Sequence, residues 1–308
     1  MRKRMLMRAV GMLVGAGLAA TVAPAAVAAP APQLQKAPVT KNQVRVQAPR
    51  TAKVTGNATA NAGKLTAGQQ LLPGAKAVDN DATLEMQVDG NLVIYLNTSS
   101  GQHFQAAWST HTWGNAGAYL DMQADGNLVL YKQGGGPTTG GALWSTGTWG
   151  HAGALADFVT GELAVHMPAA NPIWATGTGY LPAKDAAGNY IDSPSDTLYS
   201  NWSLIPGSWI ESTSAWVLMQ GDGNVVLYRK RDGKALWSSG TWNKSNVVAV
   251  MDPKGVLAVI DKNTGYPYWD TNTWNSPNAY AKIQSDLNFV VYTPGGSAVW
   301  NSQTWAQY

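Results

Sequence analysis

The chain has 308 residues, among them 33 Gly, 14 Trp and no Cys. Without cysteine it forms neither disulfides nor a thiolate site, so packing must stabilise it, which this length permits in one or two domains. Charge is segregated: residues 1–64 hold ten Lys or Arg and no acidic residue, whereas residues 65–308 hold eleven against eighteen Asp or Glu, a formal charge of −7. An acidic main part argues against nucleic acid as a partner.

The first 28 residues have the layout of a secretory signal peptide. Four basic residues within the first eight precede the apolar segment Ala9 to Val22, and Ala26-Val27-Ala28 matches a cleavage site. An uncleaved membrane anchor is the alternative, but no stop-transfer pattern follows, and no other segment is apolar enough to span a bilayer. We therefore expect a secreted, extracellular protein, either free or associated with the cell wall. We expect no integral membrane contact.

Two segments lack any regular hydrophobic period. Residues 29–63 are rich in Pro, Ala and Gln and contain no aromatic residue, which predicts a flexible basic spacer. Its basic side chains could contact an anionic cell wall or simply be solvated. Residues 179–195 contain Pro, Gly and Asp without alternation, which predicts a linker. These segments delimit two similar domains, residues 64–178 and 196–308.

Each of these domains contains three repeats. A nine-residue motif reads QVDGNLVIY at 87–95, QADGNLVLY at 123–131, QGDGNVVLY at 220–228 and QSDLNFVVY at 284–292. Asp-Gly between apolar runs is a hairpin signal, because Gly tolerates positive φ. On the strand that leaves the turn, Asn127, Val129 and Tyr131 share one face, while Leu128 and Leu130 point to the other. Short strands at regular spacing predict an all-β fold.

Every repeat also carries a Trp-containing segment after its motif. The segments read AWSTHTW, LWSTGTW, IWATGTG, LWSSGTW, YWDTNTW and VWNSQTW, and they contain eleven of the 14 Trp. A regular set of large apolar side chains is most simply explained as core around a pseudo-symmetry axis. The alternative is that these Trp residues are platforms on which sugars stack.

The polar set of one motif suits a ligand with several hydroxyl groups. A Gln amide, an Asp carboxylate, an Asn amide and a Tyr hydroxyl offer both donors and acceptors, and a Val lies between the last two. A pyranose has adjacent hydroxyls, each a donor and an acceptor, with C–H patches between them. The motif therefore predicts a carbohydrate site.

The pattern Q-x-D-x-N-x-V-x-Y, followed by Trp-Ser/Thr segments, resembles that of the monocot mannose-binding (bulb-type) lectins over residues 65–178 and 196–308. The resemblance implies two tandem β-prism II domains with threefold pseudo-symmetry, each with three four-stranded sheets. It implies that Asp and Asn bind O2 of mannose, Gln O3 and Tyr O4, and that Val packs on the sugar carbons. The implied binding residues are Gln87, Asp89, Asn91, Val93, Tyr95, Gln123, Asp125, Asn127, Val129, Tyr131, Gln220, Asp222, Asn224, Val226, Tyr228, Gln284, Asp286, Asn288, Val290 and Tyr292.

Two repeats provide an internal control for a purely structural role of the motif. At the same five positions the third repeat has Phe, Thr, Glu, Ala and His (158, 160, 162, 164 and 166), and the fifth has Asp, Lys, Val, Ala and Ile (252, 254, 256, 258 and 260). Both keep the turn Gly and the Trp segment, so we expect them to fold without binding mannose. Leu287 replaces the turn Gly of the sixth repeat and predicts a changed or strained turn.

Nothing in the sequence predicts catalysis, a metal site or a cofactor. A glycosidase needs two carboxylates across the scissile bond, and the four intact motifs share only one. The four His residues have no ligand spacing, no nucleophile elbow is present, and no calcium loop follows the Asp-Gly turns.

We therefore expect a multivalent lectin that binds mannose-rich glycans, with a lectin-like bacteriocin as the alternative. Weak single sites gain strength on a branched target through effective concentration. The strands near Trp174 and near Trp300 could be exchanged between the halves, giving a pseudo-dimer, or between chains, giving a homodimer.

Overall fold

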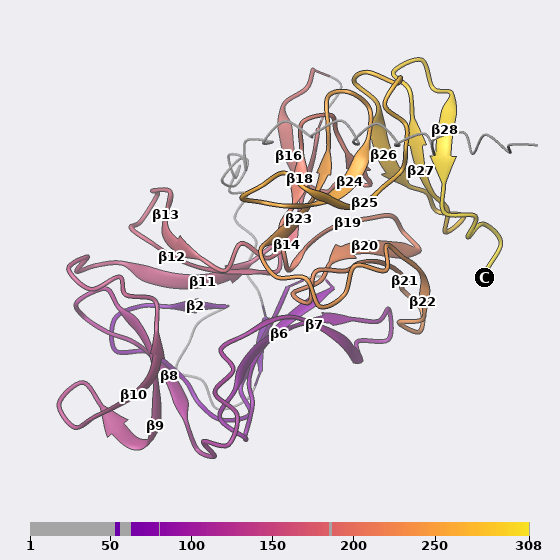
Figure 1. Ribbon diagram of the computed structural model, residues 1–308. Helices are drawn as coiled ribbons and strands as arrows, with labels where there is room; N and C mark the ends of the chain where they lie inside the picture. Colours follow the sequence, from indigo (N-terminus) through magenta and orange to yellow (C-terminus); the bar gives the residue numbers. More distant parts are fainter. Residues whose placement is uncertain (1–52, 56–62, 80, 185–186, 308) are drawn as a thin grey trace, which may run out of the picture. The chain divides into compact units, whose positions relative to one another are not determined.

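The computed structural model describes residues 53–55, 63–79, 81–184 and 187–307 (Figure 1). Within these ranges all regular elements are β-strands, which confirms the predicted all-β class. No helix in the described part of the chain is long and apolar enough to cross a membrane. The predicted signal peptide lies outside the described residues.

The first half contains three sheets, one for each repeat. In each sheet the three strands of one repeat form an antiparallel meander, and a fourth strand lies at its edge. The sheet of the first repeat consists of β4 (Lys76–Asp79), β5 (Ala82–Met86), β6 (Leu92–Asn97) and β7 (His103–Ser109), with β1 (Lys53–Thr55) added beside β4. The second consists of β3 (Gln70–Leu71), β8 (Tyr119–Met122), β9 (Leu128–Gly136) and β10 (Gly140–Ser145). The third consists of β2 (Lys64–Leu65), β11 (Leu155–Val159), β12 (Glu162–His166) and β13 (Pro172–Ala175).

The second half repeats this plan. Its fourth-repeat sheet contains β19 (Ser208–Glu211), β20 (Ala215–Met219), β21 (Val225–Arg229) and β22 (Ala235–Ser238). Its fifth-repeat sheet contains β18 (Ser203–Leu204), β23 (Val247–Met251), β24 (Leu257–Asp261) and β25 (Pro267–Asp270). Its sixth-repeat sheet contains β17 (Thr197–Leu198), β26 (Tyr280–Ile283), β27 (Phe289–Tyr292) and β28 (Ala298–Asn301). The fold is thus two tandem three-sheet domains of the β-prism II type, as the resemblance to the bulb-type lectins implied.

The short edge strands show how each domain is closed. β2 and β3 precede the first repeat in the sequence but pair with β11 and β8, in the third and second repeats. β17 and β18 pair in the same way with β26 and β23. Each domain therefore uses its own first residues to complete two of its sheets.

The strands near Trp174 and Trp300 are not exchanged between the halves. β13 pairs with β12, and β28 pairs with β27, so each lies in the half to which its sequence belongs. The exchange within the chain that the sequence left open is therefore wrong for these strands. The physical reason is that each of these strands follows directly on the hairpin of its own repeat, so a short connection brings it beside β12 or β27.

The first Trp of each segment forms the centre of a domain. Trp108, Trp144 and Trp174 meet edge to face, with ring centroids 5.7, 6.3 and 5.4 Å apart. Trp237, Trp269 and Trp300 form an equivalent trio, with centroids 5.2, 5.5 and 5.7 Å apart. These trios pack against the two main hydrophobic clusters and confirm the predicted core role for six of the eleven segment Trp residues.

Three strands lie in the predicted linker, and one lies in the predicted spacer. β14 (Gly179–Tyr180) pairs in parallel with β19, and β15 (Pro182–Lys184) forms a hairpin with β16 (Tyr190–Pro194). β1 pairs antiparallel with β4. At these residues the chain is extended and hydrogen-bonded, which the lack of alternation in the sequence did not indicate.

Candidate functional site

Each intact motif covers a turn and the strand that follows it. These strands are β6, β9, β21 and β27, in the first, second, fourth and sixth repeats. In the second repeat, Leu128 and Leu130 are fully buried in the core. Asn127, Val129 and Tyr131 lie on the other face of the strand, where Val129 pairs with Asp121 and Tyr131 with Tyr119. The predicted division of the strand into a core face and a site face is therefore present.

The Asn side chain serves the fold with one atom and leaves the other for a ligand. Asn127 Oδ1 accepts hydrogen bonds from Thr146 Oγ1 and from the backbone N–H of Thr148, both 3.1 Å long. Both lone pairs of the oxygen are then used, which fixes the amide so that Nδ2 is left as a donor. Asn91 and Asn224 are held in the same way, by Thr110 and Thr112 and by Ser239 and Thr241.

The residues that hold these Asn side chains are not among the predicted site residues. They are the two hydroxyl residues of an S/T-x-T pattern in each segment. One residue separates this pattern from the first Trp of the segment. The second of them also donates to the carbonyl of the turn Gly, as Thr148 Oγ1 does to Gly126 O over 2.7 Å. The repeated S/T-x-T pattern was the signal that could have identified them.

The two carboxylate oxygens of the Asp side chain also have different roles. Asp125 Oδ1 accepts the backbone N–H of Asn127 at 2.9 Å, which shapes the turn as an Asx motif. Equivalent bonds of 3.0, 3.0 and 2.9 Å occur at Asp89, Asp222 and Asp286. Asp89, Asp125 and Asp222 are exposed, so the second carboxylate oxygen can accept a hydrogen bond from a ligand.

Gln and Tyr are joined to each other in all four copies. The Gln Nε2 donates to the Tyr hydroxyl over 2.9 Å at Gln87, 2.6 Å at Gln123, 2.8 Å at Gln220 and 3.0 Å at Gln284. This bond orients the Tyr O–H as a donor and leaves Gln Oε1 as an acceptor. The copies in the first, second and sixth repeats thus present two acceptors and two donors around a buried Val, which is an arrangement that can hydrogen-bond adjacent hydroxyl groups of a pyranose.

The two degenerate repeats form the same hairpins without the polar set. β11 pairs with β12 and β23 pairs with β24 in full register, and Thr178 and Thr273 still donate to the carbonyls of Gly161 and Gly255. The polar set is therefore not needed for the hairpin, although Asp and Asn contribute bonds to it where they are present.

The face of the third repeat carries an ion pair instead of a sugar-type site. His166 Nε2 lies 2.8 Å from Asp157 Oδ2, and His166 Nδ1 bonds to Met167 O at 2.9 Å. The bond to Asp157 raises the pKa of His166, against the opposing effect of burial. In the fifth repeat the same face is apolar, with Val248, Val250, Val256, Ala258 and Ile260 in one buried cluster.

Leu287 changes the sixth-repeat site as the sequence indicated. It has a φ of 76°, a left-handed conformation that costs a non-glycine residue about 1–2 kcal/mol, and its side chain is buried in the core. The neighbouring loop lies further away than in the other copies: Ala306 N to Asp286 O is 3.3 Å, against 2.9 Å for His151 N to Asp125 O. Thr304 N is 3.4 Å from Asn288 Oδ1, so this Asn is held less tightly.

The fourth-repeat site differs from the other three because β7 of the first half contacts it. Tyr228 donates its hydroxyl to Gln105 Oε1 over 3.3 Å, and its ring meets Phe104 edge to face at 5.3 Å. Burial raises the pKa of Tyr228. Its cross-strand neighbour Trp216 is fully buried and stacks on Phe104 at 4.9 Å. A ligand must displace Gln105 to use this hydroxyl.

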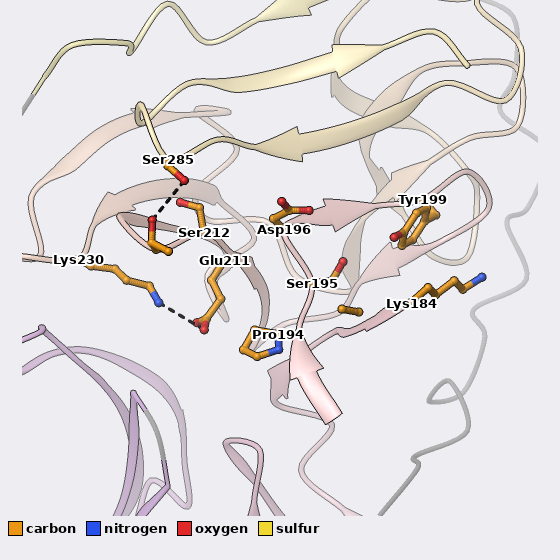
Figure 2. Close-up of a pocket in the computed structure, with 11 residues that line it drawn as sticks. Lys184, Pro194, Ser195, Asp196, Tyr199, Glu211, Ser212, Lys230 and Ser285 are labelled. Atoms are coloured by element: carbon orange, nitrogen blue, oxygen red, sulfur yellow. Dashed lines mark hydrogen bonds and ion pairs between the residues drawn. The ribbon is translucent and has the colours of Figure 1, made fainter. Parts of the chain in front are cut away.

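A separate cavity of about 510 Å³ lies where β15 and β16 approach β19 (Figure 2). It is lined by Lys184, Asp196, Glu211, Lys230 and Ser285 among others, and Lys230 pairs with Glu211 at 3.3 Å. Burial raises the pKa of Glu211. None of the twenty predicted binding residues lines this cavity, so it is not the site that the motifs form. In the described residues no group of three or more His, Cys, Asp or Glu is placed to hold a metal ion.

Comparison with known proteins places the chain beside lectins of known structure. No protein-family model matches it, and no curated protein does. A monomeric monocot mannose-binding lectin from Gastrodia elata is 33% identical, covering 36% of this chain and 99% of that one, with a TM-score of 0.34. The mannose-specific agglutinin of snowdrop (Galanthus nivalis), complexed with methyl-α-D-mannoside, is 30% identical and covers 35% and 96%, with a TM-score of 0.30. The two-domain, fetuin-binding agglutinin of Scilla campanulata is 22% identical and covers 79% and 97%, with a TM-score of 0.28.

Proposed function

We propose that this chain is a secreted, multivalent lectin for mannose or mannose-rich glycans, of the monocot mannose-binding (bulb-type) kind that its motifs resemble. The observation that carries the proposal is the divided use of the motif side chains. One half of each Asp and Asn side chain shapes the turn, and the other half, together with Gln Oε1 and the Tyr hydroxyl, is left for a ligand.

The four copies are unequal candidates for sugar binding. The Gln87 and Gln123 sites have both Asn contacts at 3.1 Å and a turn Gly. The Gln284 site has the looser Asn288, and the Gln220 site has a Tyr hydroxyl that already bonds to Gln105. We propose that the first-half sites bind most tightly, the Gln284 site next, and the Gln220 site least.

The proposal includes no catalytic step. Only the Asp is common to the four motifs, and the two additional carboxylates beside the first-half sites are engaged. Glu85 pairs with Lys76 at 3.1 Å. Asp121 is buried and hydrogen-bonded to Gln70, and its burial raises its pKa. A glycosidase needs a pair of carboxylates free to act as acid and as base or nucleophile.

A glycan array and a titration test this function. On the array we expect the purified protein to bind glycans with terminal mannose, and Asp125→Ala and Asn127→Ala to weaken that binding. At each site a few sugar–protein hydrogen bonds replace sugar–water hydrogen bonds, with a net gain of about 1 kcal/mol apiece. Free mannose should therefore bind weakly. Isothermal titration should show much tighter binding to mannan than to mannose because several sites act together. Equal affinity for both sugars would contradict multivalent binding.

A further inference from the structure

Four Trp side chains are exposed, and each belongs to a repeat with an intact motif. Trp113, Trp149, Trp242 and Trp305 end the S/T-x-T-W segments, and their exposed fractions are 61, 69, 57 and 53%. The third repeat has Gly179 at this position. The fifth repeat has Trp274, which is half-buried and packs against the apolar cluster of its own sheet. An exposed Trp therefore accompanies the polar set and is missing where that set is missing.

These Trp residues are not needed by the fold. The core of each domain uses the first Trp of each segment, and the third repeat forms its sheet with Gly in place of the second. An indole that is more than half exposed leaves a large apolar surface in water. This surface does not stabilise the fold, but a partner that covers it would bind more tightly. Their place beside the motif calls for a functional explanation.

The backbone holds each exposed Trp at the edge of its site. The residue before Trp113, Thr112, donates its backbone N–H to Asn91 Oδ1 at 3.1 Å. Two residues after it, Asn115 donates its backbone N–H to Asp89 O at 2.9 Å. Consecutive Cα atoms are about 3.8 Å apart, so the Trp113 Cα lies within about 8 Å of the Asn91 oxygen. Trp149 is held by Thr148 and His151 in the same way.

We propose that these four Trp residues form a second subsite beside each intact motif, where an indole stacks on the C–H face of the hexose next to the mannose bound by the motif. The ligand is then an oligosaccharide of at least two hexoses rather than a single sugar. The inference rests on the proposed function, because the motif must hold one sugar for its neighbour to reach the indole. Stacking of an aromatic ring adds about 0.5–1.5 kcal/mol to a contact.

The test compares two sugars on one set of variants. Methyl α-mannopyranoside fills only the motif, whereas a branched α-linked mannotriose also reaches the indole. In the combined variant W113A/W149A/W242A/W305A we expect mannotriose affinity by titration to fall about threefold to tenfold. Methyl mannoside affinity should stay within twofold. The corresponding four Trp→Tyr changes should restore most of the mannotriose affinity. Tyr266→Ala, which removes an aromatic side chain 56% exposed in the degenerate fifth repeat, is the matched control and should bind like the unaltered protein.

Iodide quenching of Trp fluorescence gives a second reading that does not depend on affinity. Bound mannotriose should protect the exposed Trp residues from iodide in the unaltered protein, and methyl mannoside should protect them less. Equal affinity of the four-Trp variant and the unaltered protein for mannotriose would overturn the inference alone. A four-Trp variant that keeps mannotriose affinity but loses binding to phosphatidylglycerol vesicles would also overturn it and assign the Trp residues to a lipid surface. If the unaltered protein bound neither sugar, the proposed function would fail, and this inference with it.

Discussion

Asn127 and Asp125 show how a single side chain can serve both a turn and a candidate ligand. The Oδ1 atoms of both are used inside the protein, at 2.9–3.1 Å from their partners. From the sequence alone, a turn-shaping role and a binding role seemed to be alternatives for these residues. The structure shows that the turn-shaping role exists but uses only part of each side chain, and the degenerate repeats show that the hairpin forms without it.

His166 occupies the Tyr position of the third repeat and gives this repeat a pH dependence. Asp157 raises the pKa of His166, so the ion pair contributes stability that is fully present below the unfolded pKa of about 6.5. That contribution is lost as pH rises through the raised folded pKa. In Asp157→Asn, burial of the imidazole remains without its charged partner and should disfavour its protonation.

We therefore expect Asp157→Asn to destabilise the protein more at pH 5.5 than at pH 8. Urea denaturation at the two pH values measures the difference, and an NMR titration of the His166 ring in the unaltered protein checks the raised pKa directly. An equal loss of stability at both pH values would show that the ion pair does not couple to folding.

At the scale of the hairpin, two glycines with positive φ have different roles. Gly126, in the motif turn, has a φ of 91°, and a Cβ there would overlap the carbonyl oxygen of His151. Gly147, in the S/T-x-T turn, has a φ of 69° and open space around it. Other repeats place His111, Asn272 and Gln303 at the position of Gly147, with φ of 58, 55 and 58°. The motif turn needs Gly for space, and the second turn needs it only for conformation.

Gly147→Ala should accordingly cost about 1–2 kcal/mol for its backbone conformation. Gly126→Ala should cost a further ~1–3 kcal/mol because the loop that carries His151 must move. The same displacement should loosen the Asn127 contacts, as the longer bonds around Leu287 illustrate. Thermal unfolding of the two variants measures the difference, and equal destabilisation would contradict the close approach at Gly126.

The repeats and their intact or degenerate motifs could be predicted from the sequence because each is a local pattern. The six hairpins, the four polar sets and the strain at Leu287 followed from it. The exposure of Trp113 and its equivalents could not be predicted, because the sequence of a segment does not show which of its two Trp residues packs into the core. Nor could the edge pairing of β2 and β3, or the contact of Gln105 with Tyr228, since each joins residues far apart in the sequence.

At the scale of the whole chain, the two halves share part of one hydrophobic cluster. Trp209, Trp216 and Leu218 of the second half belong to the cluster that contains the first-half core, and Phe104 packs against it. Lys230 also pairs with Asp81 at 2.7 Å. Because these contacts cross between the halves, the halves should stabilise each other and unfold together.

We expect calorimetry of the unaltered protein to show one transition. Phe104→Ala removes the contacts with Trp216 and Tyr228 and should cost roughly 2 kcal/mol, less than the 3–5 kcal/mol of a fully buried Phe. It should also separate the unfolding of the halves into two transitions. Two transitions in the unaltered protein would show that the halves are energetically independent.

Isothermal titration of one variant tests whether the four motif sites bind mannose. The combined variant D89N/D125N/D222N/D286N keeps the oxygen that shapes each turn and replaces the acceptor left for the sugar. We expect its melting temperature to stay within about 2 °C of that of the unaltered protein, since surface changes away from packing are nearly neutral. Its binding of mannotriose should fall below detection, while Lys254→Asn, at the same position in the degenerate fifth repeat, should bind normally. Undiminished mannotriose binding by the folded four-Asp variant would show that the motif carboxylates do not hold the sugar.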